Sequence, residues 1–261
     1  MTPSTTPSKS SKVKKLLYSL LSAIFWIALW ALMAHLVGLE ILVPSPAVTF
    51  KRLSELVVSL PFWQSTGASL LRITLGYLAG VITATLLAIP SAYLPSANAL
   101  IAFPQAIVRA TPVASFILLA LVWINTDVIP AFIAFLMVLP MIWSALKTAI
   151  GEVNPALIEM AHSYRIPFSK RFTYLYLPSI LPSYLTALST SLGFAWKSGI
   201  AAEVLCRPKF AMGSELYDSK IYLETVDLFA WTIAVVILSM AMDFFIKLAV
   251  RKVIGKGGKP A

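Results

Sequence analysis

Residues 155–178 read PALIEMAHSYRIPFSKRFTYLYLP, a basic segment marked by prolines within a chain that is otherwise largely apolar. Asn154 is a favourable N-cap and Pro155 a favourable first helical residue, so we expect a helix to begin there. The residue before Pro167 is disfavoured in a helix, which ends the first helix near Arg165. The segment therefore predicts a short helix, a turn, and a second short helix that begins at Pro167.

The composition of the whole chain is that of a membrane protein. Of 261 residues, 59% are hydrophobic and 12% are charged, and the mean hydropathy is +0.84. Soluble domains carry about 25% charged residues, so this chain has too few to cover a globular surface in water. We conclude that lipid covers much of it.

The formal net charge of +10 does not indicate a nucleic-acid-binding protein. The basic residues cluster before the first apolar run and at the end of the chain, which is the distribution that the positive-inside rule produces. No signature of an RNA- or DNA-binding module is present. The single cysteine, Cys206, excludes an intrachain disulfide.

Several apolar runs have the length of about 20 residues that a transmembrane helix needs. The first run, Leu16–Leu36, is longer than the apolar region of a usual signal peptide, so we interpret it as a retained helix, with cleavage as the alternative. The predicted fold class is all-α, a polytopic membrane helix bundle of about six transmembrane helices. The predicted spans are residues 16–36, 68–90, 101–124, 129–150, 175–200 and 228–250.

Six spans place both termini on the same side of the membrane. Assigning that side as cytoplasmic puts most Lys and Arg residues inside, Arg109 among them, and most acidic residues outside. We therefore expect a disordered basic cytoplasmic tail at 1–15, a single transmembrane domain at 16–250 and a basic cytoplasmic tail at 251–261. The opening segment falls in a cytoplasmic loop at about 152–172.

Two local patterns predict structure outside that loop. Gly76, Gly80, Ala84 and Ala88 recur at steps of four in the second span, a stripe of small residues that lets membrane helices approach closely. Chance in a helix tolerant of Gly and Ala is the alternative explanation. A short amphipathic helix is expected on the outer side, with Pro46 near its first turn.

The motifs of the common catalytic sites are missing from the sequence. It contains no phosphate-binding loop, no HExxH, no paired cysteine ligands and no GxSxG. The two histidines, His35 and His162, fall near opposite faces of the membrane and cannot share a metal. We therefore expect no enzyme, cofactor or metal site in this chain, and an energy source in a gradient or another polypeptide.

The helix–turn–helix at 155–178 has two interpretations from its residues alone, a docking surface or an amphipathic hairpin on anionic lipid. Its motif resembles the cytoplasmic loop of binding-protein-dependent ABC importer permeases, E-A-A-x3-G-x9-I-x-L-P. The sequence reads Glu159-Met160-Ala161, then Arg165 after three residues, then Leu175-Tyr176-Leu177-Pro178 after nine more. Arg165 stands where the family has the glycine of the turn, which puts the geometry of that turn in question.

The resemblance extends over about residues 38–250 and favours the nitrate/sulfonate/taurine type. It includes the segments LVPSPAV (42–48), SLLRITLGYLAG (69–80), VRATPVA (108–114) and LGFAWKSGIAAEVL (192–205). It implies a type I ABC importer permease fold, two permease copies, most simply a homodimer, two ABC ATPase subunits and an extracytoplasmic substrate-binding protein. ATP and Mg²⁺ would be bound by the ATPase, and the protein would be multi-pass in a bacterial inner membrane.

The same resemblance assigns coupling to the ATPase to the loop residues. These are Leu157, Glu159, Met160, Ala161, Arg165 and Pro178. It also suggests small anions such as nitrate, sulfonates or taurine as substrates. Heterocycles that resemble thiamine precursors are a further substrate class. The sequence does not identify which of them is carried.

Lys197 and Glu203 are the predicted translocation-path residues, because they lie at and just beyond the end of the fifth span among apolar neighbours. Intramembrane charges usually face a protein interior or a water-filled cavity. The alternative is that Lys197 extends to the outer interface and Glu203 caps or packs in a loop.

Two other functions compete with the importer permease. A gradient-driven secondary transporter predicts inverted repeats and paired buried charges, and the sequence shows no convincing repeat. A membrane-bound enzyme predicts clustered catalytic residues, which the sequence lacks.

Overall fold

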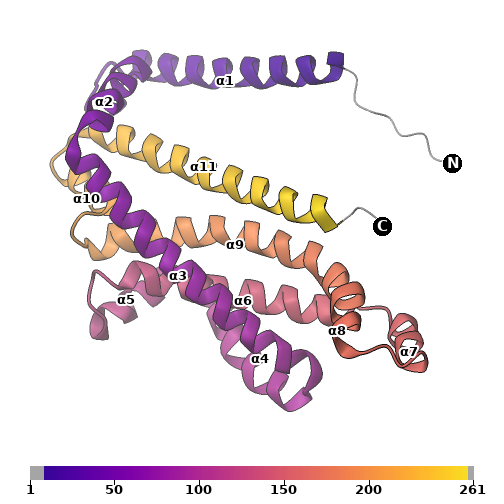
Figure 1. Ribbon diagram of the computed structural model, residues 1–261. Coiled ribbons are helices and arrows are strands. Elements are labelled where there is room, and N and C mark those ends of the chain that lie inside the picture. Colours follow the sequence, from indigo (N-terminus) through magenta and orange to yellow (C-terminus); the bar gives the residue numbers. More distant parts are fainter. Residues whose placement is uncertain (1–8, 258–261) are drawn as a thin grey trace.

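The computed structural model describes residues 9–257, and within them it contains helices and no strand (Figure 1). The loops between the helices are short, as in compact helical bundles. The elements in chain order are α1 (Lys9–Val37), α2 (Pro46–Val58), α3 (Leu60–Tyr93), α4 (Pro95–Ala110), α5 (Val113–Trp123), α6 (Ile129–Gly151), α7 (Pro155–Ser163), α8 (Phe168–Arg171), the π-helical η1 (Phe172–Tyr176), α9 (Leu177–Cys206), α10 (Met212–Ile221) and α11 (Thr225–Gly257).

Four helices, α1, α3, α6 and α11, are long and apolar enough to cross a membrane. A fifth candidate is the pair α4 and α5, which is bent by 106° at the break between the helices. The span predicted at 101–124 is therefore corrected to two segments. Thr111 precedes Pro112 and has an extended backbone, with φ −88° and ψ 131°, because the proline ring disfavours a helical residue before it.

The fifth predicted span, at 175–200, corresponds to α9. This helix has 30 residues, more than enough to cross a membrane, but it is not among the helices that meet the apolar criterion. Its polarity comes from Ser and Thr side chains, several of which line a groove described below. The predicted apolar span at 175–200 is therefore corrected to a helix of mixed polarity.

The predicted disordered tail at 1–15 is also corrected in part. Helix α1 already begins at Lys9, and α11 continues to Gly257 within the predicted tail at 251–261. An ordinary residue in a helix is at most about 0.7 kcal/mol less favourable than alanine, whereas starting a new helix is costly, so an existing helix can extend into a polar tail. Residues 1–8 and 258–261 lie outside the described part of the chain.

The centre of the bundle consists of α3, α6 and α9, which pack along one another (Figure 1). Ile73, Ile142 and Trp196, one from each helix, are fully buried. The small-residue stripe lies at the contact between α3 and α6, which confirms its prediction: a Cβ on Gly76 would press on the backbone carbonyl of Ala131. The glycine is therefore required by close helix approach rather than tolerated by chance.

Helices α2 and α11 are joined by an ion pair at the edge of the bundle. The Arg52 guanidinium donates to both carboxylate oxygens of Asp227, at 2.6 and 2.9 Å, and this hydrogen-bonded partner holds the pKa of Arg52 above its ordinary value. The short helix predicted near Pro46 is confirmed as α2, since Pro46 is its first residue and Ser45 Oγ accepts from Val48 N; its position on the outer side stays a prediction.

The bundle has two distinct ends (Figure 1). Helices α7 and α8 project from one end, where the start of α1 and the end of α11 also lie; this is called the α7 end. Helices α2 and α10 lie at the other, called the α10 end. Helix α1 stands apart and meets the rest mainly near α2, where Trp30 Nε1 donates to Pro44 O and the Trp30 ring stacks on Phe229.

Candidate functional site

Residues 155–178 fold as predicted, at the α7 end of the bundle. Asn154 Oδ1 accepts a hydrogen bond of 3.0 Å from Ala156 N, so it caps α7. Pro155 is the first residue of α7, and Pro167 precedes α8. Residues 152–172, here called the coupling loop, therefore form a helix, a turn and a short helix outside the bundle (Figure 1).

Arg165 forms the turn that glycine forms in the resembling motif. Its backbone is left-handed, with φ +51°. Arg165 N donates to His162 O, and Ile166 N donates to Ala161 O, both at 2.9 Å; this pair of bonds defines a Schellman motif that satisfies the last carbonyls of α7. The chain thus retains the glycine-type turn, at a conformational cost of about 1–2 kcal/mol for a side-chain-bearing residue.

Four of the six predicted coupling residues line one hollow of about 540 Å³ between α7 and α8. They are Leu157, Met160, Ala161 and Arg165, and the wall is completed by Tyr164, Ile166, Pro167, Lys170, Arg171, Tyr174 and Leu175. Leu157 is 41% exposed and Met160 48% exposed, although both are apolar. The hollow is therefore an apolar surface with a basic rim and no cover within the described chain.

The other two predicted coupling residues lie outside that hollow. Glu159 is exposed on α7, and Pro178 is exposed in the first turn of α9. The side chains of α7 and α8 also touch directly, since Arg171 Nη1 lies 2.7 Å from His162 Nε2. The coupling loop is thus held together by its own contacts, and Glu159 remains free to meet a partner.

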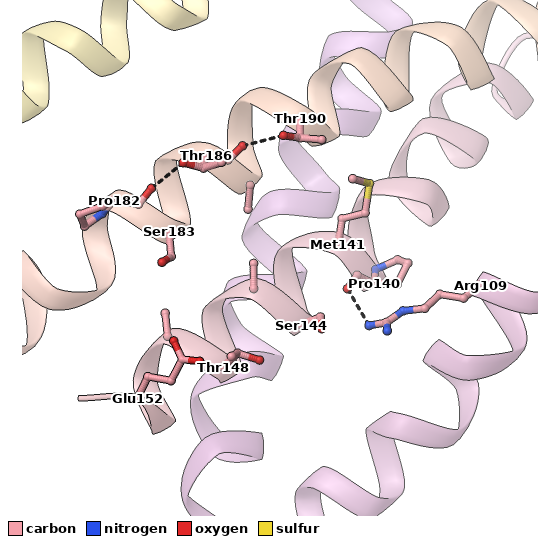
Figure 2. Close-up of a pocket in the computed structure, with 13 residues that line it drawn as sticks. Arg109, Pro140, Met141, Ser144, Thr148, Glu152, Pro182, Ser183, Thr186 and Thr190 are labelled. Atoms are coloured by element: carbon pink, nitrogen blue, oxygen red, sulfur yellow. Dashed lines mark hydrogen bonds between the residues drawn. The ribbon is translucent and has the colours of Figure 1, made fainter. Parts of the chain in front are cut away.

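A second site, not predicted from the sequence, is a groove of about 780 Å³ between α4, α6 and α9 (Figure 2). Hydroxyl side chains from two helices face it. Ser144 and Thr148 come from α6, one turn apart, and Ser183, Thr186 and Thr190 recur along one side of α9. The spacings of three and four residues within two apolar segments were the sequence signal that could have revealed it.

Arg109 contributes the positive charge of the groove. Its Nη2 donates to Pro140 O at 3.1 Å (Figure 2), and its Cζ lies 6.0 Å from the centre of the Trp143 ring. Pro140 is the middle residue of α6, about 16 Å from either end at 1.5 Å per residue. The sequence-based topology placed Arg109 on the cytoplasmic side, whereas its guanidinium lies beside the middle of a spanning helix.

The two predicted path residues do not line this groove. Lys197 lies two turns beyond Thr190 on α9, and it lines a separate hollow of about 220 Å³ with Asp243 of α11. Helical geometry puts Lys197 and Thr190 on the same side of α9. A role for Lys197 in the path therefore stays a prediction, with a position toward the α10 end.

Glu203 is fully buried and holds three elements together. Its Oε2 accepts from Ser69 Oγ at 2.8 Å and from Gly213 N at 3.1 Å. Ser69 Oγ in turn accepts from Met212 N at 2.9 Å, so α3, α9 and the start of α10 meet at one carboxylate. We call Ser69, Glu203, Met212 and Gly213 the Glu203 latch. Its geometry gives Glu203 a structural role; its predicted role in the path stays untested.

Among the described residues, no group of three or more His, Cys, Asp or Glu side chains is arranged to hold a metal ion. The coupling loop offers apolar contact and positive charge, and the groove offers hydroxyl groups and one guanidinium.

Comparisons with known proteins identify a transport family. The family described as "Binding-protein-dependent transport system inner membrane component" matches residues 106–255. The putative aliphatic sulfonates transport permease protein SsuC of Bacillus subtilis is 24% identical, over 87% of this chain and 83% of that protein. The taurine transport system permease protein TauC of Escherichia coli is 22% identical, over 73% and 69%.

A solved structure shares the fold. A chain from the crystal structure of an amino acid ABC transporter with histidines matches with a TM-score of 0.55 and 16% identity, over 79% of this chain and 95% of that chain. At that identity the match shows the arrangement of helices and nothing about the substrate.

Proposed function

The chain belongs to the family of binding-protein-dependent transport system inner membrane components, which matches more than half of its length, and we propose how this membrane permease of an ABC importer works. The chain supplies a gated path for a small anion such as nitrate, a sulfonate or taurine. A substrate-binding protein delivers the anion outside, and separate ABC ATPase subunits bind ATP and Mg²⁺. The α7 end, with both termini, faces the cytoplasm of a bacterial cell.

The observation that carries this proposal is the uncovered hollow of the coupling loop. Leu157 and Met160 are large apolar side chains with about half of their surface exposed, beyond the end of the bundle. Fully burying such a side chain contributes about 1.5–3 kcal/mol, so covering the exposed half contributes roughly 1 kcal/mol for each. A concave apolar surface fits a protein ridge better than a planar lipid surface, which favours ATPase docking over the lipid-bound hairpin.

The connections of the coupling loop explain how docking could move the path. Helix α6 ends at Gly151, close before α7 begins, and α8 continues through η1 into α9 without a break in helical structure. Two of the three groove-lining helices, α6 and α9, are therefore attached to the loop. The π-helical segment η1 is of a kind that is frequent at functional sites, and closure of the ATPase subunits would pull on α6 and α9 through the coupling loop.

Two copies of the chain complete the path. The groove is open along one side rather than enclosed, and a two-fold arrangement would place two such grooves opposite each other. Closed two-fold symmetry is by far the commonest arrangement of homo-oligomers. We therefore infer a homodimer of permease chains between two ATPase subunits.

Copurification tests the docking step. The chain is coexpressed with its ATPase and binding protein, and the double variant Leu157→Asp with Met160→Asp is compared with wild type. We expect the double variant to lose the ATPase, because two charges would be buried against it. The control is Val58→Asp, an 87% exposed apolar residue at the α10 end, which should retain the ATPase. Full ATPase recovery with the double variant would contradict the proposed docking surface.

A further inference from the structure

Arg109 is a cation at the middle depth of the bundle without a carboxylate partner among the described residues. Its one hydrogen bond is to Pro140 O, and it takes part in no ion pair. A guanidinium has five N–H donors, so most of the Arg109 donors have no partner among the described residues. A charge at this depth is costly and is expected to face a water-filled cavity or a ligand.

The groove offers further donors beside Arg109. The Ser144, Thr148 and Ser183 hydroxyls make no side-chain hydrogen bond with the described residues; in Figure 2 Ser144 lies nearest to Pro140 and Arg109, whereas Thr148 and Ser183 lie toward Glu152. Thr186 and Thr190 instead donate to carbonyls of their own helix, at 2.9 and 3.0 Å. The donors without partners therefore come from both walls of the groove.

The one carboxylate of the groove lies far from the guanidinium. Glu152 follows α6, twelve residues beyond Pro140, which is about 18 Å along the helix axis. The middle of the groove therefore has a positive potential, and the negative charge is at the α7 end. An anion would therefore be attracted to the middle of the groove, where no carboxylate lies close enough to repel it.

We propose that Arg109, with the Ser144 hydroxyl one turn beyond Pro140 on α6, forms a binding site where the translocated anion pauses midway through the permease. The inference rests on the proposed function and adds the site and the class of ligand. The ligand is a small oxyanion, because a guanidinium pairs with two oxygens at once and the Ser144 hydroxyl donates to another. A lipid headgroup shares this chemistry, but headgroups lie at the membrane surfaces and not at the depth of Pro140.

The Trp143 ring positions the guanidinium. Trp143 Nε1 donates to the buried Ser91 Oγ at 3.0 Å, which fixes the ring. The Arg109 Cζ lies over this ring at 6.0 Å, and Lys147 Nζ lies over it at 5.1 Å. Lys147 does not line the groove. It therefore offers a matched control, a second cation on the same ring outside the proposed site.

The test is ATP-driven uptake by the complete complex of permease, ATPase and binding protein in proteoliposomes. The probes are labelled nitrate, methanesulfonate and taurine. We expect Arg109→Gln to lower the maximal uptake rate about tenfold, the effect of one lost charge-assisted hydrogen bond. Arg109→Lys should recover part of the rate, because it keeps the charge. Lys147→Gln should transport at the wild-type rate.

A second readout separates anion binding from a structural role. The concentration of loaded binding protein that gives half-maximal uptake should stay unchanged in Arg109→Gln, because delivery precedes the proposed site. Should this variant fail to assemble, the variant Ser144→Ala decides, with an expected slowing of about fivefold for one lost neutral hydrogen bond.

Each remaining outcome has one meaning. A wild-type complex that takes up none of the three probes would contradict the proposed substrate class, and this site would fall with it. Wild-type uptake that Arg109→Gln leaves unchanged, or that Ser144→Ala leaves unchanged, would overturn the site alone. An equal loss in Lys147→Gln would also overturn it, by showing a general effect of positive charge.

Discussion

Replacing Glu203 by alanine should destabilise the protein, because this carboxylate joins three elements. The change removes the hydrogen bonds from Ser69 Oγ and Gly213 N to Oε2. Hydrogen bonds to a charged group contribute about 1.5–3 kcal/mol each, which gives about 3–6 kcal/mol for the two.

One feature of the latch offsets part of that loss. Glu203 Oε1 is buried without a hydrogen-bond partner among the described residues, and Arg72 Nη1 is 3.9 Å away. Removing an unsatisfied buried polar atom returns about 1–3 kcal/mol. The net destabilisation is therefore roughly 2–3 kcal/mol, which lowers the midpoint of thermal unfolding by about 4–12 °C in a protein of this size.

Thermal unfolding of the purified protein, followed by circular dichroism, measures the effect. Ser69→Ala should cost about 2 kcal/mol, because it leaves Met212 N and Oε2 each without one partner. Ser54→Ala is the control, since Ser54 bonds only to Lys51 O on an exposed face, and it should change stability by less than about 0.5 kcal/mol. Unfolding of Glu203→Ala within about 2 °C of wild type, combined with lost uptake, would refute the latch and support a role in the path.

Three further substitutions test the packing, the turn and the coupling. Gly76→Ala should destabilise by about 1–3 kcal/mol because its Cβ would overlap the Ala131 carbonyl, whereas Gly67→Ala on the same helix meets open space and should be neutral or stabilising; equal unfolding temperatures would contradict the close α3–α6 contact. Arg165→Gly should slow amide hydrogen exchange at the end of α7 about fivefold, because it removes about 1 kcal/mol of strain from the left-handed turn; faster exchange would show that the arginine stabilises it. Glu159→Lys should abolish assembly or raise the ATP hydrolysed per anion imported, and a normal ratio in an assembled complex would remove Glu159 from the coupling surface.

Features set by neighbouring residues could be predicted from the sequence. Ser45 and Asn154 cap the helices that Pro46 and Pro155 begin, because a cap acts over three residues. The Gly76 stripe was recognised for the same reason, since its spacing along one helix is visible in the sequence.

Features set by partners distant in the sequence could not be predicted in the same way. The groove brings Arg109 of α4 beside Pro140 of α6, and Glu203 of α9 bonds to Ser69 of α3. Both contacts depend on how whole helices pack. The nearest sequence signal for Glu203 was its charge among apolar residues, which a path and a buried latch explain equally well.

The break between α4 and α5 shows a third kind of difference. Pro112 was visible, and prolines in membrane helices commonly produce only a kink. Here the extended Thr111 ends α4 and turns the chain by 106°. The size of that turn depends on the packing of α5 against α6 and α9, which the sequence does not reveal.

Reconstituted uptake tests the permease function most directly. The purified chain is placed in liposomes alone, or together with its ATPase and binding protein, and labelled nitrate, methanesulfonate and taurine are offered with and without internal ATP. An ABC importer permease predicts uptake of at least one probe only when all components and ATP are present. Uptake by the chain alone, driven by a proton or sodium gradient and indifferent to ATP, would contradict it and establish a secondary transporter.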